Sequence, residues 1–147
     1  MPSFEIPETL SDEDMKVIDD GIADDCAQKG HPPYKQEYIC VVKRGNNRKP
    51  FAALMGFMEN GIFEITKLWV KSEKQSNGIG SELLKAAEEV VKARGGCSIV
   101  VWTYVFQAPG FYENHGFVKM GESPTNLKGG AKCYHYIKIL PSGNDPA

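Results

Sequence analysis

Residues 62–104 decide the fold, and they read IFEITKLWVKSEKQSNGIGSELLKAAEEVVKARGGCSIVVWTY. The first part is rich in β-branched and aromatic side chains, which is typical of a strand over 62–70. Apolar residues then recur at helical spacing and predict a helix over about 78–94, which a Gly-Gly pair ends. The segment 97–104 is apolar enough for a strand covered on both faces. Such a strand, helix and strand form a βαβ unit with parallel strands and a right-handed connection.

The residues before this unit predict one helix and an antiparallel meander. A capped start and apolar residues at spacings of three and four predict a helix over about 12–29. The compositions of 37–43 and 51–58 predict two strands. The pair Asn60-Gly61, which a tight type I′ hairpin favours, joins the second of these strands to the next one.

The residues after the βαβ unit predict a short helix and two closing strands. The helix is expected near 109–114, and the strands are expected near 117–120 and 133–140. The polar tail 142–147 is expected to fray. These elements predict a single α+β domain over 1–147, with a mixed, mostly antiparallel sheet and helices on both of its faces.

Composition and charge exclude several classes of protein. The chain has 147 residues, of which 41% are hydrophobic and 24% are charged, the balance of one globular domain. A net charge of -2 and an isoelectric point near 5.9 argue against a nucleic-acid partner, because such binding needs many Lys and Arg against phosphates. No apolar run approaches the ~20 residues that span a bilayer, and the N-terminus has no leader pattern. We therefore expect a cytoplasmic protein with no membrane partner.

The cysteines indicate neither a metal site nor a redox site. They lack the Cys-x-x-Cys spacing that is typical of zinc ligation and of thiol–disulfide chemistry. We expect reduced thiols and no metal. The cysteines are Cys26, Cys40, Cys97 and Cys133.

The loop 75–81, which reads QSNGIGS, carries the chemistry of the βαβ unit. Gly78 and Gly80 fall in the first turn of the predicted helix, where a glycine costs about 1 kcal/mol relative to alanine. Glycines let a ligand approach the backbone, and the unpaired N–H groups and positive end of a helix bind phosphate. An ordinary turn capped by Asn77 is the alternative. Ser81 stands where a P-loop has lysine, and the glycines lie too far from the strand for a dinucleotide fingerprint.

Two motifs follow one another in a fixed order along the chain. The pattern Gln-x-x-Gly-x-Gly over 75–80 is followed, after the second parallel strand, by FQAPGFYENHGF over 106–117. Together they resemble the motifs of the GNAT superfamily of acyl-CoA-dependent N-acyltransferases, and the resemblance covers roughly 56–140. It implies that strand 62–70 splays from its parallel neighbour and that the pantetheine arm of the coenzyme inserts between the two strands.

The resemblance also implies which residues bind acetyl-CoA as the acyl donor. Backbone groups at Leu68 and Val70 would bond to the pantetheine arm, and backbone amides of 75–81 would hold the pyrophosphate. Many members have arginine where this chain has Asn77, so the backbone amides are expected to do most of the holding. The implied coenzyme-binding residues are Leu68, Trp69, Val70, Gln75, Ser76, Asn77, Gly78, Ile79, Gly80, Ser81 and Phe106.

Tyr112 and Glu64 are the implied catalytic residues. Tyr112 matches the family's tyrosine beside the coenzyme sulfur, and a phenol that is protonated at neutral pH can donate to the departing thiolate. Glu64 lies where histone-type members have a glutamate base, and strand alternation places it on one face with Thr66 and Leu68. The alternatives are a Tyr112 that only packs in the core and a Glu64 that faces solvent while water accepts the proton.

Four further polar side chains near these motifs are not assigned as ligands. Lys71 and Lys74 could replace part of the charge of the missing arginine, or they could be solvated like most loop lysines. His115 and His135 are interpreted as surface or structural residues.

The resemblance predicts an N-acetyltransferase that transfers acetyl from acetyl-CoA to a primary amine of a small molecule or peptide. The predicted mechanism is direct attack in a ternary complex. The alternatives are a non-catalytic acyl-CoA sensor and an interaction module with the same fold. The acidic helix 12–29 would suit a cationic amine or is only a solvated face, and 123–131 carries no recognisable motif. The acceptor is therefore not named, and a homodimer is left open.

Overall fold

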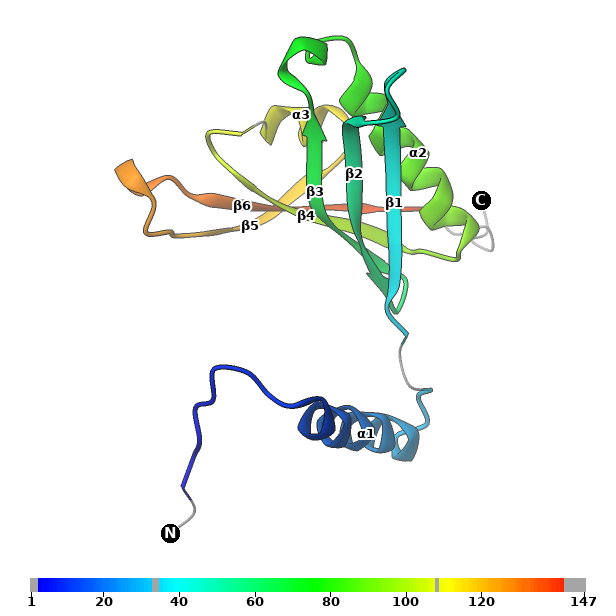
Figure 1. The fold of residues 1–147 in the computed structure, drawn as a ribbon, viewed down its shortest axis with the longest axis vertical. Helices are drawn as coiled ribbons and strands as arrows, with labels where there is room; N and C mark the ends of the chain where they lie inside the picture. Colours follow the sequence, from blue (N-terminus) through cyan, green and yellow to red (C-terminus); the bar gives the residue numbers. More distant parts are fainter. Residues whose placement is uncertain (1–2, 33–34, 108, 142–147) are drawn as a thin grey trace. The chain divides into compact units, whose positions relative to one another are not determined.

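The structure is a computed structural model that describes residues 3–32, 35–107 and 109–141 (Figure 1). By its internal contacts the chain separates into two compact units, one up to Lys35 and one from Gln36 onward. Each unit is described by itself. The tail 142–147, for which we expected fraying, lies outside the described residues.

The first unit contains one helix, α1 (Asp12–Gln28), close to the expected range. The hydroxyl of Ser11 caps this helix by accepting a hydrogen bond from the Asp14 N–H at 3.1 Å. Acidic residues fill its first turn, where the positive end of the helix dipole stabilises them. The capping pattern in the sequence therefore predicted the start of α1, and the apolar spacing predicted its length.

The second unit is built on a six-stranded sheet with the order β1-β2-β3-β4-β6-β5. Its neighbouring strands are antiparallel except β3 and β4, which are parallel, so the βαβ unit and the mostly antiparallel α+β sheet are confirmed. The strands are β1 (Glu37–Arg44), β2 (Pro50–Glu59), β3 (Ile62–Val70), β4 (Ser98–Tyr104), β5 (Val118–Ser123) and β6 (Cys133–Ile139). The helices are α2 (Ile79–Ala93) and α3 (Pro109–Asn114), with 3-10 turns at Ser72–Lys74 and Lys128–Gly130.

Strand β5 extends beyond the expected 117–120. Its register against β6 shifts between Lys119 and Gly121, which is a bulge, and pairing then continues to Ser123. The strand therefore bends at the bulge and continues past the expected end.

The turn between β2 and β3 has the conformation that its sequence predicts. Asn60 and Gly61 have φ values of 54° and 79°, and a type I′ turn requires a positive φ at both positions. The Gly61 carbonyl also accepts hydrogen bonds from the Cys97 N–H at 2.6 Å and the Ser98 N–H at 3.2 Å. These bonds align the start of β4 with the start of β3.

The parallel pair β3–β4 covers only half of each strand. Its ladder runs from Ile62↔Ser98 to Ile65↔Val101 and ends there, although both strands continue. Figure 1 shows β3 running toward the loop before α2 while β4 turns away from it. This divergence is the splay that the family resemblance implied.

A β-bulge at Thr66 lies next to the point where the ladder ends. The register of β2 against β3 shifts between Met55 and Gly56, which leaves Thr66 as an extra residue in β3. The Thr66 hydroxyl donates to the Met55 carbonyl at 3.2 Å. Glycine at position 56 permits this close approach, because a Cβ there would lie 1.9 Å from the Glu64 carbonyl oxygen.

The bulge changes which side chains share a face of β3. Strict alternation predicted Glu64, Thr66 and Leu68 on one face, and this prediction is wrong because an extra residue resets the alternation. Phe63 is buried and Glu64 is exposed, whereas Leu68 packs against the core on the side of Phe63.

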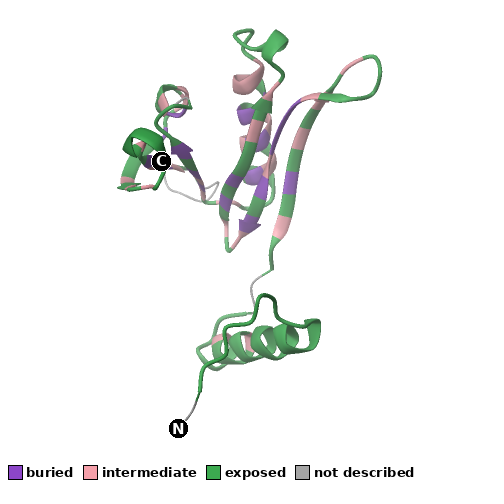
Figure 2. Ribbon diagram, turned by 60° about the vertical axis from the view of Figure 1, so that its left-hand side comes forward, coloured by how far each residue is buried: buried purple, intermediate pink, exposed green. Residues whose placement is uncertain are grey.

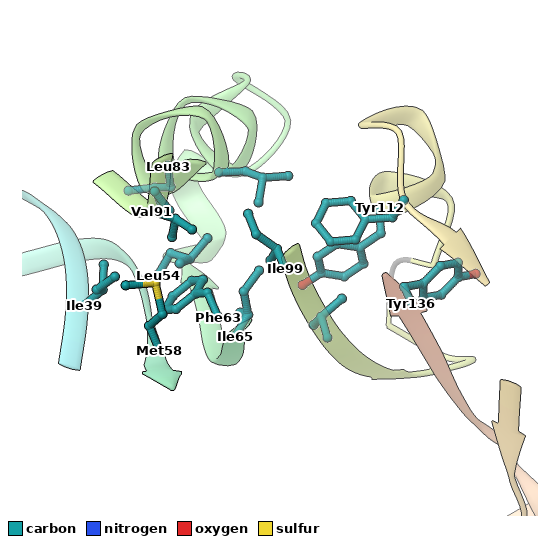
Figure 3. Packing of buried hydrophobic residues seen from close by; sticks show 14 of the residues in the cluster. Ile39, Leu54, Met58, Phe63, Ile65, Leu83, Val91, Ile99, Tyr112 and Tyr136 are labelled. Atoms are coloured by element: carbon teal, nitrogen blue, oxygen red, sulfur yellow. The ribbon is translucent and has the colours of Figure 1, made fainter. Parts of the chain in front are cut away.

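The core of the second unit lies between α2 and the sheet. Helix α2 contacts β1, β2 and β3, and buried residues alternate with exposed ones along the strands (Figure 2). Leu54 and Phe63 are fully buried beneath α2 (Figure 3). Helix α3 extends the core with Tyr112, whose ring lies 5.5 Å from Phe117 and 6.2 Å from Tyr136. The buried residues of α2 are Leu83, Leu84, Ala87 and Val91.

Candidate active site

A cleft of about 1020 Å³ opens where β3 and β4 diverge. The open half of β3, the middle of β4, the loop before α2 and the start of α3 form its walls. Its size is that of sites that enclose a cofactor or a small molecule. The lining residues are Ile65, Thr66, Lys67, Leu68, Trp69, Val70, Lys74, Gln75, Ser76, Gly78, Ile79, Gly80, Ser81, Val101, Trp102, Thr103, Gln107, Phe111 and Tyr112.

The loop before α2 holds its backbone in a left-handed conformation at two positions. Ser76 has a φ of 67°, and Gly78, the N-cap of α2, has a φ of 77°. Such turns aim successive N–H groups into one concavity, and the first N–H groups of α2 have no partner within the helix. Since Gly78 also has no side chain to cap the helix, these N–H groups are available to an anion at the positive end of the helix dipole.

Two side chains of this loop bond to the protein's own backbone. The Gln75 amide donates to the Val70 carbonyl at 2.9 Å, and the Asn77 amide donates to the Lys74 carbonyl at 3.2 Å. Gln75 therefore ties the loop to the end of β3. Asn77 does not line the cleft, so its side chain acts on the shape of the loop.

The lysines around the loop are engaged by other groups. Lys71 pairs with Glu73 at 3.3 Å, and the ammonium group of Lys74 lies 5.4 Å from the centre of the Phe51 ring. Of these two, only Lys74 lines the cleft. An anion bound here would therefore be held mainly by backbone dipoles, and Lys67 and Lys74 are the cationic side chains in the lining of the cleft.

Tyr112 lies at the floor of the cleft with only 6% of its surface exposed. Its hydroxyl has no hydrogen-bond partner within 3–32, 35–107 and 109–141. Every completely buried side-chain oxygen in that part has a partner, so this hydroxyl is not completely buried. Tyr112 lines the cleft, and Figure 3 shows its hydroxyl directed toward β4 and away from the Tyr136 hydroxyl. Burial raises the pKa of Tyr112 to about 12. The phenol stays protonated and can donate a hydrogen bond.

Most of the site residues inferred from the sequence come together in this cleft. Leu68, Trp69, Val70, Tyr112 and the loop residues other than Asn77 line it. Phe106 does not line the cleft; its ring is 65% exposed and stacks on Tyr104 at 5.5 Å. Glu64 is exposed on the face opposite Phe63 and also lies outside the lining.

Sequence reasoning missed two polar residues, Gln107 in the lining of the cleft and His115 beside it. The Gln107 carbonyl oxygen accepts hydrogen bonds from the Tyr104 N–H at 2.9 Å and from the Thr103 hydroxyl at 3.1 Å, which fixes the chain after β4. His115, interpreted above as surface or structural, lies 2.8 Å from the Ser81 hydroxyl through its Nε2. The available signal was its place in the same motif as Tyr112, four residues after Phe111.

Aromatic side chains line the cleft on the face opposite α2. Trp69 is 50% exposed and Trp102 is 59% exposed, and each follows a core-facing residue in its strand. The Trp102 ring lies 4.3 Å from the His135 ring, which is held by a 2.7 Å hydrogen bond to Ser123. The open strands thus present the loop and Tyr112 on one face and indole rings on the other.

The part of the chain that the structure describes contains neither a metal-binding cluster nor a membrane-spanning helix. No group of three or more His, Cys, Asp or Glu within that part is placed to hold a metal ion. No described helix has the length and apolar composition needed to cross a bilayer.

A parallel strand pair that opens beside a glycine-bearing helix start, with a buried tyrosine in the lining of the opening, is the arrangement that the family resemblance implied. Residues 35–119 match the family model described as "Acetyltransferase (GNAT) domain". The chain therefore belongs to the GNAT acetyltransferase family, as its two motifs predicted.

Known proteins with similar sequences or structures include several acetyltransferases. The blasticidin-S acetyltransferase of Streptomyces morookaense is 35% identical over 104 residues, which cover 70% of this chain and 73% of that protein. An acetyltransferase from Bacillus cereus has a TM-score of 0.75 at 25% identity, covering 92% of this chain and 98% of that one. An aminoglycoside 6′-N-acetyltransferase solved with coenzyme A has a TM-score of 0.64 at 17% identity, covering 92% and 98%. This last similarity shows the fold alone.

Proposed function

We propose that this protein transfers the acetyl group of acetyl-CoA to a primary amine of a small molecule, by direct attack in a ternary complex. The observation that carries the proposal is the cleft itself, in which the start of α2 and Tyr112 line one opening between β3 and β4. An anion site and a proton donor that share a cleft suit a donor with a pyrophosphate at one end and a leaving thiolate at the other.

The donor would lie along the face of the cleft that carries the loop. The N–H groups of 75–81 would hold the pyrophosphate, with Lys74 beside them. The pantetheine arm would follow the open half of β3, where Leu68 and Val70 have no β4 partner. The coenzyme A bound to the aminoglycoside acetyltransferase of the same fold supports this choice of donor.

The reaction needs a nucleophile, an oxyanion site and a proton for sulfur. The neutral amine attacks the thioester carbonyl, the C–N bond forms, and negative charge collects on the carbonyl oxygen. Backbone N–H groups in the open half of β3 would stabilise that charge. When the C–S bond breaks, the thiolate takes the Tyr112 proton, and the amine loses a proton to solvent. Tyr112 recovers its proton from water.

Glu64 would accept the amine proton only through water. It is exposed on the face that Trp69 and Trp102 share, yet it does not line the cleft. A direct transfer requires hydrogen-bond distance to the amine. We therefore assign Glu64 a supporting role and expect Glu64→Gln to retain most of the turnover.

The acceptor would enter from the face that carries the two indole rings. Exposed Trp69 and Trp102 offer flat apolar surface for a small organic amine. The S. morookaense relative is named for the acetylation of the antibiotic blasticidin S, which supports a small-molecule acceptor. Blasticidin S is therefore the first amine to test.

The test is release of coenzyme A from acetyl-CoA by the purified protein, with a panel of amines that includes blasticidin S, aminoglycosides, polyamines and a peptide. At least one small amine should give saturable release and an acetylated product by mass spectrometry. Acetyl-CoA at 100 times its Kd should add about 2.7 kcal/mol of apparent stability. Thermal stabilisation without turnover on any amine would overturn the enzymatic proposal in favour of a sensor, and no stabilisation would overturn donor binding.

A further inference from the structure

A hydrogen bond joins the coenzyme-facing start of α2 to the segment after α3. The Ser81 Oγ and the His115 Nε2 lie 2.8 Å apart, and both side chains are half-buried. Ser81 lines the cleft in the first turn of α2. His115 follows the last residue of α3, where its N–H donates to the Tyr112 carbonyl at 3.0 Å. The short helix that carries Tyr112 is thus bonded to the first turn of α2.

The packing around this bond holds both partners in place. The Phe111 ring lies 4.7 Å from the His115 ring. Phe111 also reaches Gly80, where an added Cβ would lie 3.4 Å from the ring. Phe111 therefore fills the space between the two helices, and the imidazole has little freedom to turn away from Ser81.

Two of the lysines near the loop are already paired with carboxylates, so a hydroxyl donor would contribute to anion binding there. Lys71 is paired with Glu73, and Lys43 bonds to Glu82 in the first turn of α2. Two carboxylates thus lie close to the loop in sequence, and their partner cations are already engaged. Besides Lys67 and Lys74, the donors available to a pyrophosphate at this site are neutral: the backbone N–H groups and the Ser81 hydroxyl.

We propose that His115 is a positioning residue for the coenzyme: its Nε2–H donates to the Ser81 oxygen, so that the Ser81 hydroxyl proton points into the cleft toward the pyrophosphate. A serine hydroxyl has one proton. If Ser81 donated to His115, only its lone pairs would face the phosphate, and they would repel it. Coenzyme binding therefore selects the imidazole tautomer that carries a proton on Nε2. This inference rests on the proposed function, because it assumes a coenzyme pyrophosphate in the cleft.

Two variants separate the hydrogen bond from the packing. His115→Phe keeps a ring against Phe111 and removes the donor, whereas His115→Gln keeps an N–H donor near the position of Nε2 and removes the ring. Calorimetry should show that His115→Phe weakens coenzyme A binding about tenfold and that His115→Gln stays within about threefold of wild type. Ser81→Ala should weaken binding as much as His115→Phe does. The double variant should be no weaker than either single one.

The donor substrate supplies the readout that a purely structural role would not change. With the amine found in the panel, His115→Phe should raise KM for acetyl-CoA and leave kcat within about twofold. Its kcat/KM with S-acetylpantetheine, which has no pyrophosphate, should equal the wild-type value. An equal loss with both donors, an unchanged Kd in His115→Phe, or additive losses in the double variant would overturn the inference. Absence of coenzyme A binding by the wild type would instead overturn the proposed function, and the inference with it.

Discussion

The two halves of β3 differ in almost every physical respect although they are continuous in sequence. From Ile62 to Ile65 the strand pairs with β4, and Phe63 is fully buried beneath α2. From Thr66 onward it has no β4 partner, and Trp69 is half exposed. The closed half packs into the core, whereas the open half has no β4 partner and exposes an indole ring.

One local feature separates the halves. The bulge at Thr66 lies immediately after the last parallel pair, at Ile65. Bulges bend a strand and increase its twist, so an extra residue here turns the rest of β3 away from β4. If β3 and β4 were paired along their whole length, no cleft would open between them. The cleft therefore originates from an irregularity in the register of β3, the bulge at Thr66.

The largest effect on stability is expected from a substitution in the closed half of β3. Phe63→Ala removes a fully buried ring and should lower the free energy of unfolding by about 3–5 kcal/mol. Trp69→Ala, on the open half of the same strand, should change it by less than about 1 kcal/mol. Urea unfolding monitored by circular dichroism measures both. Equal losses would mean that the open half is also part of the core.

The next largest effect is expected on turnover, from a substitution of Tyr112, which lines the cleft beside the open half of β3. Tyr112→Phe removes the proposed acid and should lower kcat about 100-fold while the protein stays folded. Tyr136→Phe is the matched control, because that phenol is buried nearby but donates to Glu113 at 2.8 Å outside the cleft. It should cost about 1–3 kcal/mol of stability and leave kcat near wild type. If Tyr112→Phe keeps wild-type turnover when chemistry is rate-limiting, the acid role is wrong.

A smaller effect is expected on coenzyme binding, from a comparison of glycine substitutions at the two ends of α2. Gly78 and Gly95 flank α2, with φ values of 77° and 81° and open space around each. Alanine at either position should destabilise the protein by about 1–2 kcal/mol, because L-residues are strained there. Only Gly78→Ala should also weaken coenzyme A binding. Equal affinities of the two variants would show that the loop does not hold the coenzyme.

The smallest expected effect is in the pH dependence of turnover. An ordinary tyrosine, with a pKa of about 10, would lose half of its acid form at pH 10. Burial raises the pKa of Tyr112 to about 12, and an upward shift keeps the protonated form to higher pH. Between pH 8 and pH 10, kcat at saturating substrates should therefore show no decline from this group. A decline centred near pH 10 that Tyr112→Phe abolishes would contradict the raised pKa of Tyr112 but would agree with its role as the acid.

The parts of the fold that the sequence predicted have local signals. Asn60-Gly61 encodes its own turn, and the apolar period of 79–93 encodes the helix of the βαβ unit. The bulge was not predicted, because nothing at Thr66 marks it. It depends on Gly56 in the neighbouring strand, and the assumption of strict alternation therefore placed Leu68 on the wrong face.

The site was predicted as far as its contacts are local in sequence. The loop glycines and Tyr112 belong to motifs, and the structure brings them to one cleft. The bond between Ser81 and His115 joins residues 34 positions apart, so no local pattern could show it. Phe106 was inferred from its place in a motif, but its ring stacks outward on Tyr104. Neighbours in sequence point to different sides of the chain, and only the backbone path decides which side faces the cleft.

The difference between the halves of β3 can be measured directly by amide hydrogen exchange, residue by residue, with and without acetyl-CoA. Binding should slow exchange in the open half at Leu68 and Val70 and at the start of α2, from Gly78 to Ser81. Exchange in the closed half, from Ile62 to Ile65, should slow no more than exchange across the rest of the sheet. Protection confined to the closed half, or none at the start of α2 when the ligand is bound, would show that the open half of β3 is not the binding surface for the coenzyme.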